Sequence, residues 1–487
     1  MLNLALEEVK KYEKDFSAVP VCAEVFADMM TPIGFLNSVR ESSNNYFLLE
    51  SVEGGEKWGR YSFIGFDPIV RIVAKDNSME VKNTAAVKFT SDNPVDCLRE
   101  VLAEYKVPKL KDLPPFTGGF VGYFAYEFFK YCEPDFKFST DKKTEFPDFD
   151  LMLFDKVIAF DHLKQKIFII VNVKTDHVEV NYRKAEREIE QIKQMLKKAG
   201  SYPEFVPAKL GEMVPNMNKE DYMAMVEKGK QYIKAGDIFQ VVLSQQFTAD
   251  YDQSLFNVYR ILRTTNPSQY MVLIKNDDVE IAGSSPETLV KISGKEITTM
   301  PIAGTRPRGA TESEDLRLEE ELLADEKEIA EHNMLVDLGR NDVGRVSRFG
   351  TVKVLDYKKI SRFSHVMHIT TRVTGEMNND KDNLDALCSI FPAGTLSGAP
   401  KIRACEIIDE LEPTARGPYG GGMGYIDFSG NLDVCITIRT MVKRANKVYV
   451  QAGAGIVADS VPESEYQECM NKAGAVFQAL RETTKAR

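Results

Sequence analysis

Cysteine is sparse in this chain of 487 residues and shows no pairing pattern. The seven cysteines include no C-x-x-C pair, and they lie scattered at positions 22, 97, 132, 388, 405, 435 and 469. Their odd number and wide spacing argue against a zinc site and against a disulfide framework. Reduced thiols in a cytoplasmic protein are therefore expected.

Long apolar runs and an excess of positive charge are missing as well. No stretch approaches the ~18 consecutive apolar residues of a membrane-spanning helix, and residues 1–10 lack the apolar core of a secretory signal. The formal net charge is −11, so we expect no binding to nucleic acid or to membranes. An anionic substrate would need a metal ion, or local Arg, Lys and backbone N–H groups, to be held by such a chain.

Two glycine patterns imitate nucleotide-binding motifs. Residues 394–401 (GTLSGAPK) depart from the G-x-x-x-x-G-K-[ST] loop, because Ala399-Pro400 separate the second glycine from the lysine. Residues 453–458 (GAGIVA) resemble a dinucleotide fingerprint, but Pro462 interrupts the helix that this motif requires. We predict instead a turn at Gly453-Ala454-Gly455 whose N–H groups can approach a carboxylate, with a purely structural turn as the alternative.

The apolar pattern shows no repeating strand–helix–strand rhythm. It favours an α+β fold of large antiparallel β-sheets flanked by helices. Residues 201–218 contain three prolines and are the predicted linker between an N-terminal domain, 15–200, and a C-terminal domain, 219–480. Helices are predicted at 180–198 and 219–235, and strands at 46–51, 151–160, 166–173, 237–247 and 432–440.

Acidic pairs recur on two predicted helices. Glu328 and Glu331 share one side of a helix over residues 325–342, and Glu465 and Glu468 have the same spacing after Pro462. If the two pairs met, they would form a carboxylate group suited to Mg²⁺. Read from spacing alone, each pair is more simply a solvated acidic helix face.

Histidine is scarce, and three of the five histidines (His332, His365 and His368) fall within 37 residues. The last two share a predicted strand over 364–369, where residues three apart face opposite sides, so only one of them can point into a given site. A structural role is the simpler explanation for each.

Arg439, in the predicted strand 432–440, is either a salt-bridge partner or a carboxylate anchor. Together these features favour a metal-assisted site for a small dicarboxylate, with a non-catalytic acid-binding module as the alternative.

Several longer segments, taken in their order along the chain, are more specific to a protein family than the short patterns above. They are PIAGTRPRG (301–309), DEKEIAEH (325–332), LVDLGRND (335–342), GTLSGAPK (394–401), QAGAG (451–455) and DSVPESE (459–465). These motifs resemble the chorismate-utilising enzymes, and within that family the component I subunits of anthranilate synthase, over roughly residues 15–480. The resemblance implies a sandwich of antiparallel sheets, a regulatory tryptophan site in residues 15–200 and a chorismate-binding catalytic domain in 219–480.

The resemblance also implies roles for individual residues. Glu331 and Glu468 would bind Mg²⁺, with Glu328 and Glu465 as second carboxylates, directly or through water, and the metal would hold the ring carboxylate of chorismate. The substrate would be gripped by Gly304, Thr305, Tyr419, Arg439, Gly453, Ala454 and Gly455, with Arg439 and the glycine N–H groups on the enolpyruvyl carboxylate.

The implied catalytic residues are Glu287, His368 and Thr395. Glu287 would protonate the departing C4 hydroxyl, so we predict that it is buried, close to other carboxylates and raised in pKa. Ammonia would add at C2, and His368 and Thr395 would assist the later loss of pyruvate, which aromatises the ring.

Two absent lysines narrow the activity within the family. Aminodeoxychorismate synthases typically place a nucleophilic lysine where this chain has Ala303, and isochorismate and salicylate synthases place a water-activating lysine where it has Gln240. Both absences favour amination by ammonia at C2. Aminodeoxychorismate synthase component I stays the alternative, because some members lack the lysine, and a catalytically silent regulator that binds chorismate or tryptophan is a third hypothesis.

A regulatory site and a partner are implied too. Ser51 and the segment Gln269-Tyr270-Met271 resemble the tryptophan-binding motif, except that the family usually has proline at Gln269, which bears on the strength of inhibition. No segment resembles a glutamine amidotransferase, so ammonia would come from a separate component II. A heterotetramer of two large and two small subunits is expected.

Overall fold

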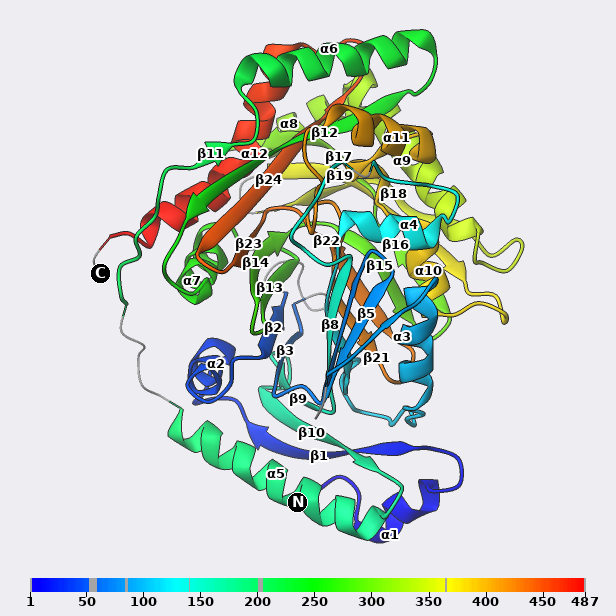
Figure 1. Cartoon of the computed structure of the whole chain (residues 1–487), viewed down its shortest axis with the longest axis vertical. Coiled ribbons are helices and arrows are strands. Elements are labelled where there is room, and N and C mark those ends of the chain that lie inside the picture. Colours follow the sequence, from blue (N-terminus) through cyan, green and yellow to red (C-terminus); the bar gives the residue numbers. More distant parts are fainter. Residues whose placement is uncertain are drawn as a thin grey trace.

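The architecture is that of a computed structural model, which describes residues 2–51, 59–83, 86–139, 141–199, 205–363 and 366–485. Within these residues the strands form two sheets of 12 strands each, and the pairings are antiparallel. The predicted α+β fold with large antiparallel sheets is confirmed (Figure 1).

The first sheet joins strands from both ends of the chain. Its order is β1 (Ala18–Phe26), β10 (Lys166–Lys174), β9 (Lys156–Asp161), β3 (Tyr61–Phe66), β2 (Tyr46–Glu50), β13 (Tyr270–Lys275), β14 (Val279–Ser285), β23 (Thr440–Arg444), β24 (Lys447–Ile456), β12 (Gln240–Asp250) and β11 (Val214–Pro215), with β20 (Gly398–Ala399) also paired to β12.

The second sheet also joins strands from both halves of the chain. Its order is β17 (Ile302–Pro307), β19 (Val366–Glu376), β16 (Glu296–Thr299), β15 (Thr288–Ser293), β22 (Leu432–Ile436), β21 (Gly422–Asp427), β7 (Gly119–Phe124), β8 (Phe149–Phe154), β4 (Val70–Lys75), β5 (Ser78–Lys82) and β6 (Ala86–Thr90), with β18 (Lys353–Arg362) on β19. Strands on both sides of residues 201–218 therefore pair with each other in each sheet. The predicted domain boundaries stay a prediction, and residues 201–204 of the predicted linker lie outside the described residues.

A buried aromatic cluster packs the two sheets together as a sandwich. Phe47 of β2 meets Phe154 of β8 with ring centroids 4.8 Å apart, and Phe63 of β3 meets Tyr425 of β21 at 6.0 Å. Because each pair joins one sheet to the other, burial of these rings fixes how the sheets face each other.

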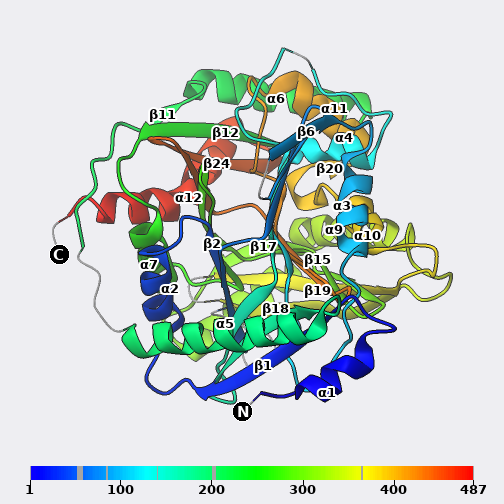
Figure 2. The same ribbon diagram turned by 60° about the horizontal axis from the view of Figure 1, so that its bottom comes forward.

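Helices cover the outer faces of the sandwich. The helices are α1 (Leu6–Val9), α2 (Pro32–Arg40), α3 (Pro94–Ala103), α4 (Phe129–Cys132), α5 (Val178–Lys198), α6 (Lys219–Ala235), α7 (Phe256–Thr265), α8 (Glu312–Ala324), α9 (Glu326–Gly344), α10 (Asn383–Ile390), α11 (Lys401–Leu411) and α12 (Pro462–Glu482), with 3₁₀ turns η1 (Lys10–Tyr12), η3 (Tyr126–Phe128) and η4 (Gly394–Leu396). Helix α5 lies along β1 and β10 at one end, and α6 and α12 lie side by side at the other (Figures 1 and 2). Among the described residues, no helix combines the length and the apolar character needed to cross a bilayer.

The predicted strand over 151–160 is wrong in one respect. The chain leaves the second sheet at the end of β8 and enters the first sheet at β9, with Asp155 between them. The hairpin with the next strand is confirmed, because β9 pairs with β10. The apolar pattern runs unbroken through Asp155 because both sheets bury their strands here, so alternation alone does not reveal the crossing.

Candidate active site

Two candidate site residues lie where the chain crosses from one sheet to the other. Glu287 stands between β14 of the first sheet and β15 of the second, and Arg439 stands between β22 of the second and β23 of the first. The crossings are held side by side, since the Ile436 N–H donates to the Glu287 carbonyl at 3.0 Å and the Ser284 N–H donates to the Arg439 carbonyl at 3.1 Å. The sandwich therefore brings an acid and a guanidinium to one corner.

Arg439 does not lie in a strand, so the predicted strand over 432–440 is wrong at this point. β22 ends at Ile436, and Arg439 has a φ of +51°, a left-handed conformation that non-glycine residues adopt only where the surrounding fold imposes it. Burial lowers the pKa of its guanidinium, and none of the described residues forms an ion pair with it. A partly buried cation without a protein carboxylate is suited to an anionic ligand.

Glu287 is buried, as predicted. The Thr395 hydroxyl donates to its Oε1 at 3.0 Å. Burial raises the pKa of this carboxyl to about 8, against the opposing effects of the Thr395 hydroxyl, the Ile302 N–H and the charge of Lys472. The predicted neighbouring carboxylates are not among the groups that act on Glu287, and every group that does so besides burial lowers its pKa. The acid form dominates at neutral pH.

Thr395 is placed by the close packing of its turn against α9. The turn η4 carries Thr395 between Gly394 and Leu396, and a Cβ on Gly394 would lie 2.2 Å from Cδ2 of Leu338 in α9. A side chain at position 394 would have to displace Leu338, so glycine lets the turn lie this close to α9, from where the Thr395 hydroxyl reaches Glu287.

His368 of β19 is held as a neutral imidazole. Its Nδ1 lies 2.8 Å from the Gly304 carbonyl and 3.1 Å from the Thr305 hydroxyl, and a carbonyl only accepts, so Nδ1 carries the hydrogen. Burial, together with the charges of Arg439 and Lys472, lowers the pKa of His368 to about 4. The Nε2 lone pair is left available to accept a proton. His365, the neighbour considered with it, lies outside the described residues.

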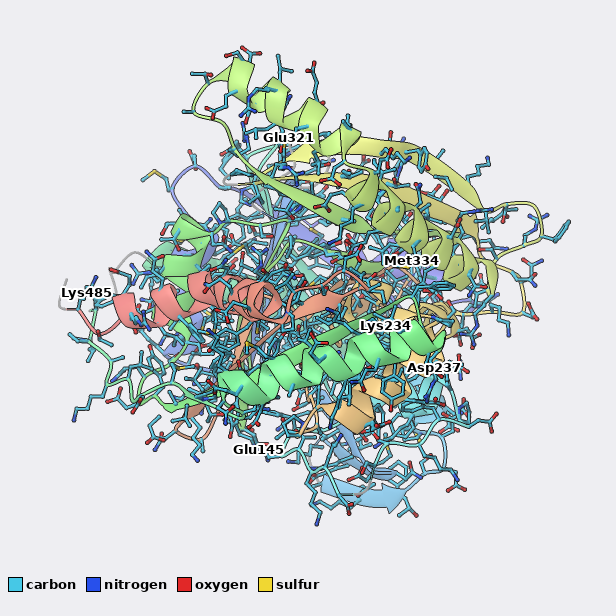
Figure 3. All side chains as sticks on the ribbon, turned by 90° about the horizontal axis from the view of Figure 1, so that it is seen from above. Glu145, Lys234, Asp237, Glu321, Met334 and Lys485 are labelled. Carbon is cyan, nitrogen blue, oxygen red and sulfur yellow. The ribbon has the colours of Figure 1, made fainter. Side chains whose placement is uncertain are left out.

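The two acidic pairs are on helices that approach each other. Asp325 caps α9 by accepting from the Lys327 and Glu328 N–H groups, and Glu328 and Glu331 follow on this helix, as predicted. Burial, and then the charges of Glu328 and Glu468 from α12, raise the pKa of Glu331. Glu465 of α12 also has a raised pKa, from burial and from the charge of Glu468. Figure 3 looks down on α9, where Met334 is labelled, and on α12, which ends near Lys485.

These carboxylates fit a hard divalent cation in their chemistry. Carboxylate oxygens are the ligands that Mg²⁺ prefers. No three His, Cys, Asp or Glu side chains in the described parts of the chain already lie close enough to hold an ion. Ion binding would therefore require the side chains of Glu331 and Glu468 to turn toward a common point.

Gly453, Ala454 and Gly455 lie in strand β24, so the predicted turn is wrong. They pair with Ser244, Leu243 and Val242 of β12. A Cβ on Gly453 would lie 2.5 Å from the Leu243 carbonyl oxygen, and one on Gly455 would lie 2.6 Å from Nε2 of Gln240. The glycines therefore allow the β12 backbone and the Gln240 side chain to pack closely against β24, and they do not form a turn of the chain.

Gln240 contacts the acidic helix directly. Its Nε2 donates to Oε1 of Glu331 at 3.0 Å, while its own Oε1 is buried without a partner among the described residues. Gln240 thus stands beside the candidate metal ligand, and its hydrogen bond lowers the pKa of Glu331.

Lys472 was not singled out in the sequence, yet it reaches across the site. Its Nζ lies 2.7 Å from Oε1 of Glu468 and 3.1 Å from the Gly453 carbonyl oxygen. Its charge lowers the pKa of Glu287, Glu331 and His368. The signal in the sequence was its position four residues after Glu468 on one helix, a spacing that pairs opposite charges.

Tyr419 borders the same crossing. The Arg416 guanidinium lies over its ring, 5.6 Å from the centroid, and burial raises the pKa of its hydroxyl. The next residue, Gly420, donates its N–H to the Thr437 carbonyl at 3.0 Å, which places Tyr419 near the β22–β23 crossing that carries Arg439. Thr305 is exposed in β17, beside Gly304.

A separate cavity of about 400 Å³ is lined by residues of β2, β3 and β13 from the first sheet and of β21 from the second. All four residues predicted for the regulatory site, Ser51, Gln269, Tyr270 and Met271, line it. The remaining lining includes Glu50, Arg60, Lys291, Tyr425 and Asp433. This volume and mixed lining suit a small amphipathic ligand.

Glu287 and His368 supply an acid and a base at this corner, and the partly buried Arg439 guanidinium, which forms no ion pair among the described residues, gives it a group that can hold an anion. A family model described as "chorismate binding enzyme" matches residues 44–478, and the chain belongs to this family. The chain is 50% identical over 496 residues to anthranilate synthase component 1 of Acetivibrio thermocellus, covering 100% of both chains, and 45% identical over 484 residues to that of Aquifex aeolicus (strain VF5), covering 98% of both.

A solved structure, anthranilate synthase component I from Streptococcus pneumoniae TIGR4, is 34% identical, with a TM-score of 0.76 over 93% of this chain and 98% of that one. The predicted resemblance to component I of anthranilate synthase is confirmed.

Proposed function

We propose that the chain is the large subunit of an anthranilate synthase, a lyase that converts chorismate and ammonia to anthranilate and pyruvate in L-tryptophan biosynthesis. The observation that carries this proposal is Glu287, a buried carboxyl with a pKa of about 8 beside Arg439 at the corner of the two sheets. The relatives named above support it.

The first chemical step uses the acid form of Glu287. Glu287 donates its proton to the C4 oxygen of chorismate, which leaves as water as the C4–O bond breaks. The nitrogen of ammonia forms a bond at C2, the two ring double bonds shift toward C4, and the nitrogen releases one proton to solvent. A raised pKa keeps this proton available at neutral pH, and the Thr395 hydroxyl steadies the carboxylate that results.

The second step removes pyruvate. His368 is neutral, so its Nε2 accepts the C2 proton while the enolpyruvyl side chain departs and the ring becomes aromatic. The Gly304 carbonyl fixes the tautomer and orientation of the imidazole, and Arg439 holds the carboxylate of the departing group.

The residues at two discriminating positions support amination by free ammonia. Ala303 lies in β17 with no nucleophile, so covalent capture of the ring is not available there. Gln240 has an amide that bonds to Glu331, where a lysine would activate water. Neither Ala303 nor Gln240 therefore favours the aminodeoxychorismate synthase or the isochorismate synthase reaction.

Mg²⁺ is the proposed cofactor. Glu331 and Glu468 would hold it, with Glu328 and Glu465 as supporting carboxylates. When bound, the ion would supply positive charge to the ring carboxylate of chorismate. Lys472, paired with Glu468, balances part of the acidic charge from within the chain.

A partner and an inhibitor complete the proposal. Ammonia would be delivered by a glutamine amidotransferase subunit, as the designation "component 1" of the relatives suggests, in a cytoplasmic heterotetramer. L-Tryptophan would bind in the cavity lined by Ser51 and Gln269-Tyr270-Met271 and inhibit the reaction. A buried glutamine at position 269 is expected to change the strength of that inhibition.

The test is an assay of the purified chain with chorismate, Mg²⁺ and an ammonium salt at high pH, where free ammonia is abundant. Formation of anthranilate, detected by its fluorescence, supports the proposal. Formation of aminodeoxychorismate would assign the chain to the alternative synthase, and an inert, folded chain would support the silent regulator.

A further inference from the structure

Thr288 stands between the catalytic acid and the cavity. It follows Glu287 directly and begins β15. On the cavity side, the Tyr270 hydroxyl lies 2.8 Å from the Thr288 hydroxyl and the Gln269 amide lies 3.5 Å from it. One peptide bond therefore separates Glu287 of the candidate active site from Thr288, which contacts residues that line the cavity.

The direction of these hydrogen bonds can be assigned. The Tyr270 hydroxyl donates its single proton to Oδ1 of Asp433 at 2.8 Å, so it must accept from Thr288. Oδ2 of Asp433 is paired with Lys291 at 2.9 Å. Tyr270, Asp433 and Lys291 all line the cavity. A ligand in the cavity can therefore contact each residue of the hydrogen-bond network that includes the Thr288 hydroxyl.

The backbone at this point is irregular. The pairing of β15 with β22 shifts register between Thr288 and Val290, where Thr288 lies opposite Cys435 and Val290 opposite Val434. Irregularities of this kind re-aim side chains and are common beside active sites. A displacement of Thr288 therefore need not disturb the whole sheet in order to move Glu287.

We propose that Thr288 is the positioning residue through which a ligand in the cavity controls Glu287. A ligand that engages the Gln269 amide and the Tyr270 hydroxyl removes the group that donates to the Thr288 hydroxyl and the group that accepts from it. The Glu287 carboxyl then moves from the place where Thr395 holds it. This inference rests on the proposed regulation by tryptophan, and it predicts that the two sites are coupled energetically in both directions.

The experiment compares the wild-type chain with Thr288→Val, which loses the hydroxyl and keeps the branched shape. Thr288→Ser, which keeps the hydroxyl, is the matched control. Tryptophan binding is measured by calorimetry with and without saturating chorismate, in the absence of ammonia. Inhibition of anthranilate formation is measured in parallel. Thr288→Ala is a second hydroxyl-free variant in case the valine variant fails to fold.

In the wild type we expect chorismate to weaken tryptophan binding by about fivefold or more, a typical coupling between sites. In Thr288→Val the tryptophan affinity without chorismate should stay close to that of the wild type, while the coupling and the inhibition fall toward none. Thr288→Ser should restore both.

Each contrary result has a distinct meaning. If Thr288→Val or Thr288→Ala binds tryptophan and is inhibited as strongly as the wild type, the role of Thr288 is refuted and the regulatory cavity stands. If the wild-type chain binds no tryptophan, the proposed ligand of the cavity is wrong, and the coupling through Thr288 is refuted with it.

Discussion

At the scale of single residues, the proposed chemistry depends on two pKa values that shift in opposite directions, that of Glu287 upward and that of His368 downward. Burial raises the pKa of Glu287 to about 8, and it lowers the pKa of His368 to about 4. Desolvation disfavours the charged form of each group, so the carboxyl keeps its proton and the imidazole stays neutral. An acid and a base are thereby available at the same pH.

The raised pKa of Glu287 predicts a pH dependence. The group must be protonated to act, so the rate, divided by the concentration of free ammonia, should be level below about pH 8 and fall as pH rises beyond it. The Thr395 hydroxyl stabilises the ionised form, so Thr395→Val should shift the fall to higher pH, whereas Thr395→Ser should not. Steady-state rates across pH measure both. A fall at the same pH in Thr395→Val would contradict this account of Glu287.

The proposed metal ligand Glu468 gives a second prediction. Its contact with Lys472 is an exposed pair, worth about 0–1 kcal/mol, so Glu468→Gln should fold normally. Turnover with Mg²⁺ should nevertheless fall by more than the roughly 10–100-fold that accompanies loss of a supporting group. Glu463→Gln, on the same helix and paired with Lys219, is the control. Normal activity in Glu468→Gln would remove the metal assignment.

At the scale of elements, the glycines of β24 set how closely two strands meet. A Cβ on Gly453 would collide with the backbone at Leu243, so Gly453→Ala should lower the free energy of unfolding by about 1–3 kcal/mol. At Gly474 of α12 an added Cβ would have no neighbouring atom within 4 Å, and Gly474→Ala should be neutral or stabilising. Urea unfolding measures both changes. Equal stability of Gly453→Ala and the wild type would show that the strands have room to separate.

Local signals in the sequence predicted the helices well. Asn218 accepts from the Asp221 N–H at the start of α6, and Gly236 ends that helix with a φ of +85°. Asp325 likewise begins α9, which places Glu328 and Glu331 as predicted. Helix caps and turns of this kind depend on residues a few positions apart, so the local sequence is enough to predict where these helices begin and end.

The crossings between sheets could not be predicted in the same way. Asp155 and Arg439 interrupt apolar runs that look continuous, because the strands on either side are buried in different sheets. The glycines at 453–455 look like a turn, but they serve close strand packing that depends on β12, about two hundred residues earlier in the chain. The roles of the site residues came from the resemblance, whereas the approach of Lys472 to Glu287, Glu331 and His368 became visible only in the structure.

At the scale of the whole molecule, the two halves of the chain share both sheets. β2 pairs with β13 in the first sheet, and β7 pairs with β21 in the second. A fragment of residues 205–487 would expose these sheet edges and the aromatic surface between the sheets.

This fragment should therefore fail to fold alone, and it should recover structure and activity when co-expressed with residues 1–204. Circular dichroism and co-elution of the two fragments on a sizing column are the measurements. A folded, monomeric 205–487 fragment would show instead that the C-terminal half has a self-sufficient core.

The most direct test of the whole account is anthranilate formation by the wild-type chain and by Glu287→Gln, side by side. Both proteins would receive chorismate, Mg²⁺ and ammonium salt at about neutral pH, and anthranilate would be followed by fluorescence. The account predicts steady formation by the wild type and a loss of roughly 10²–10⁴-fold in Glu287→Gln, which cannot supply the proton. Equal anthranilate formation by the two proteins, or none by a correctly folded wild-type chain, would contradict it.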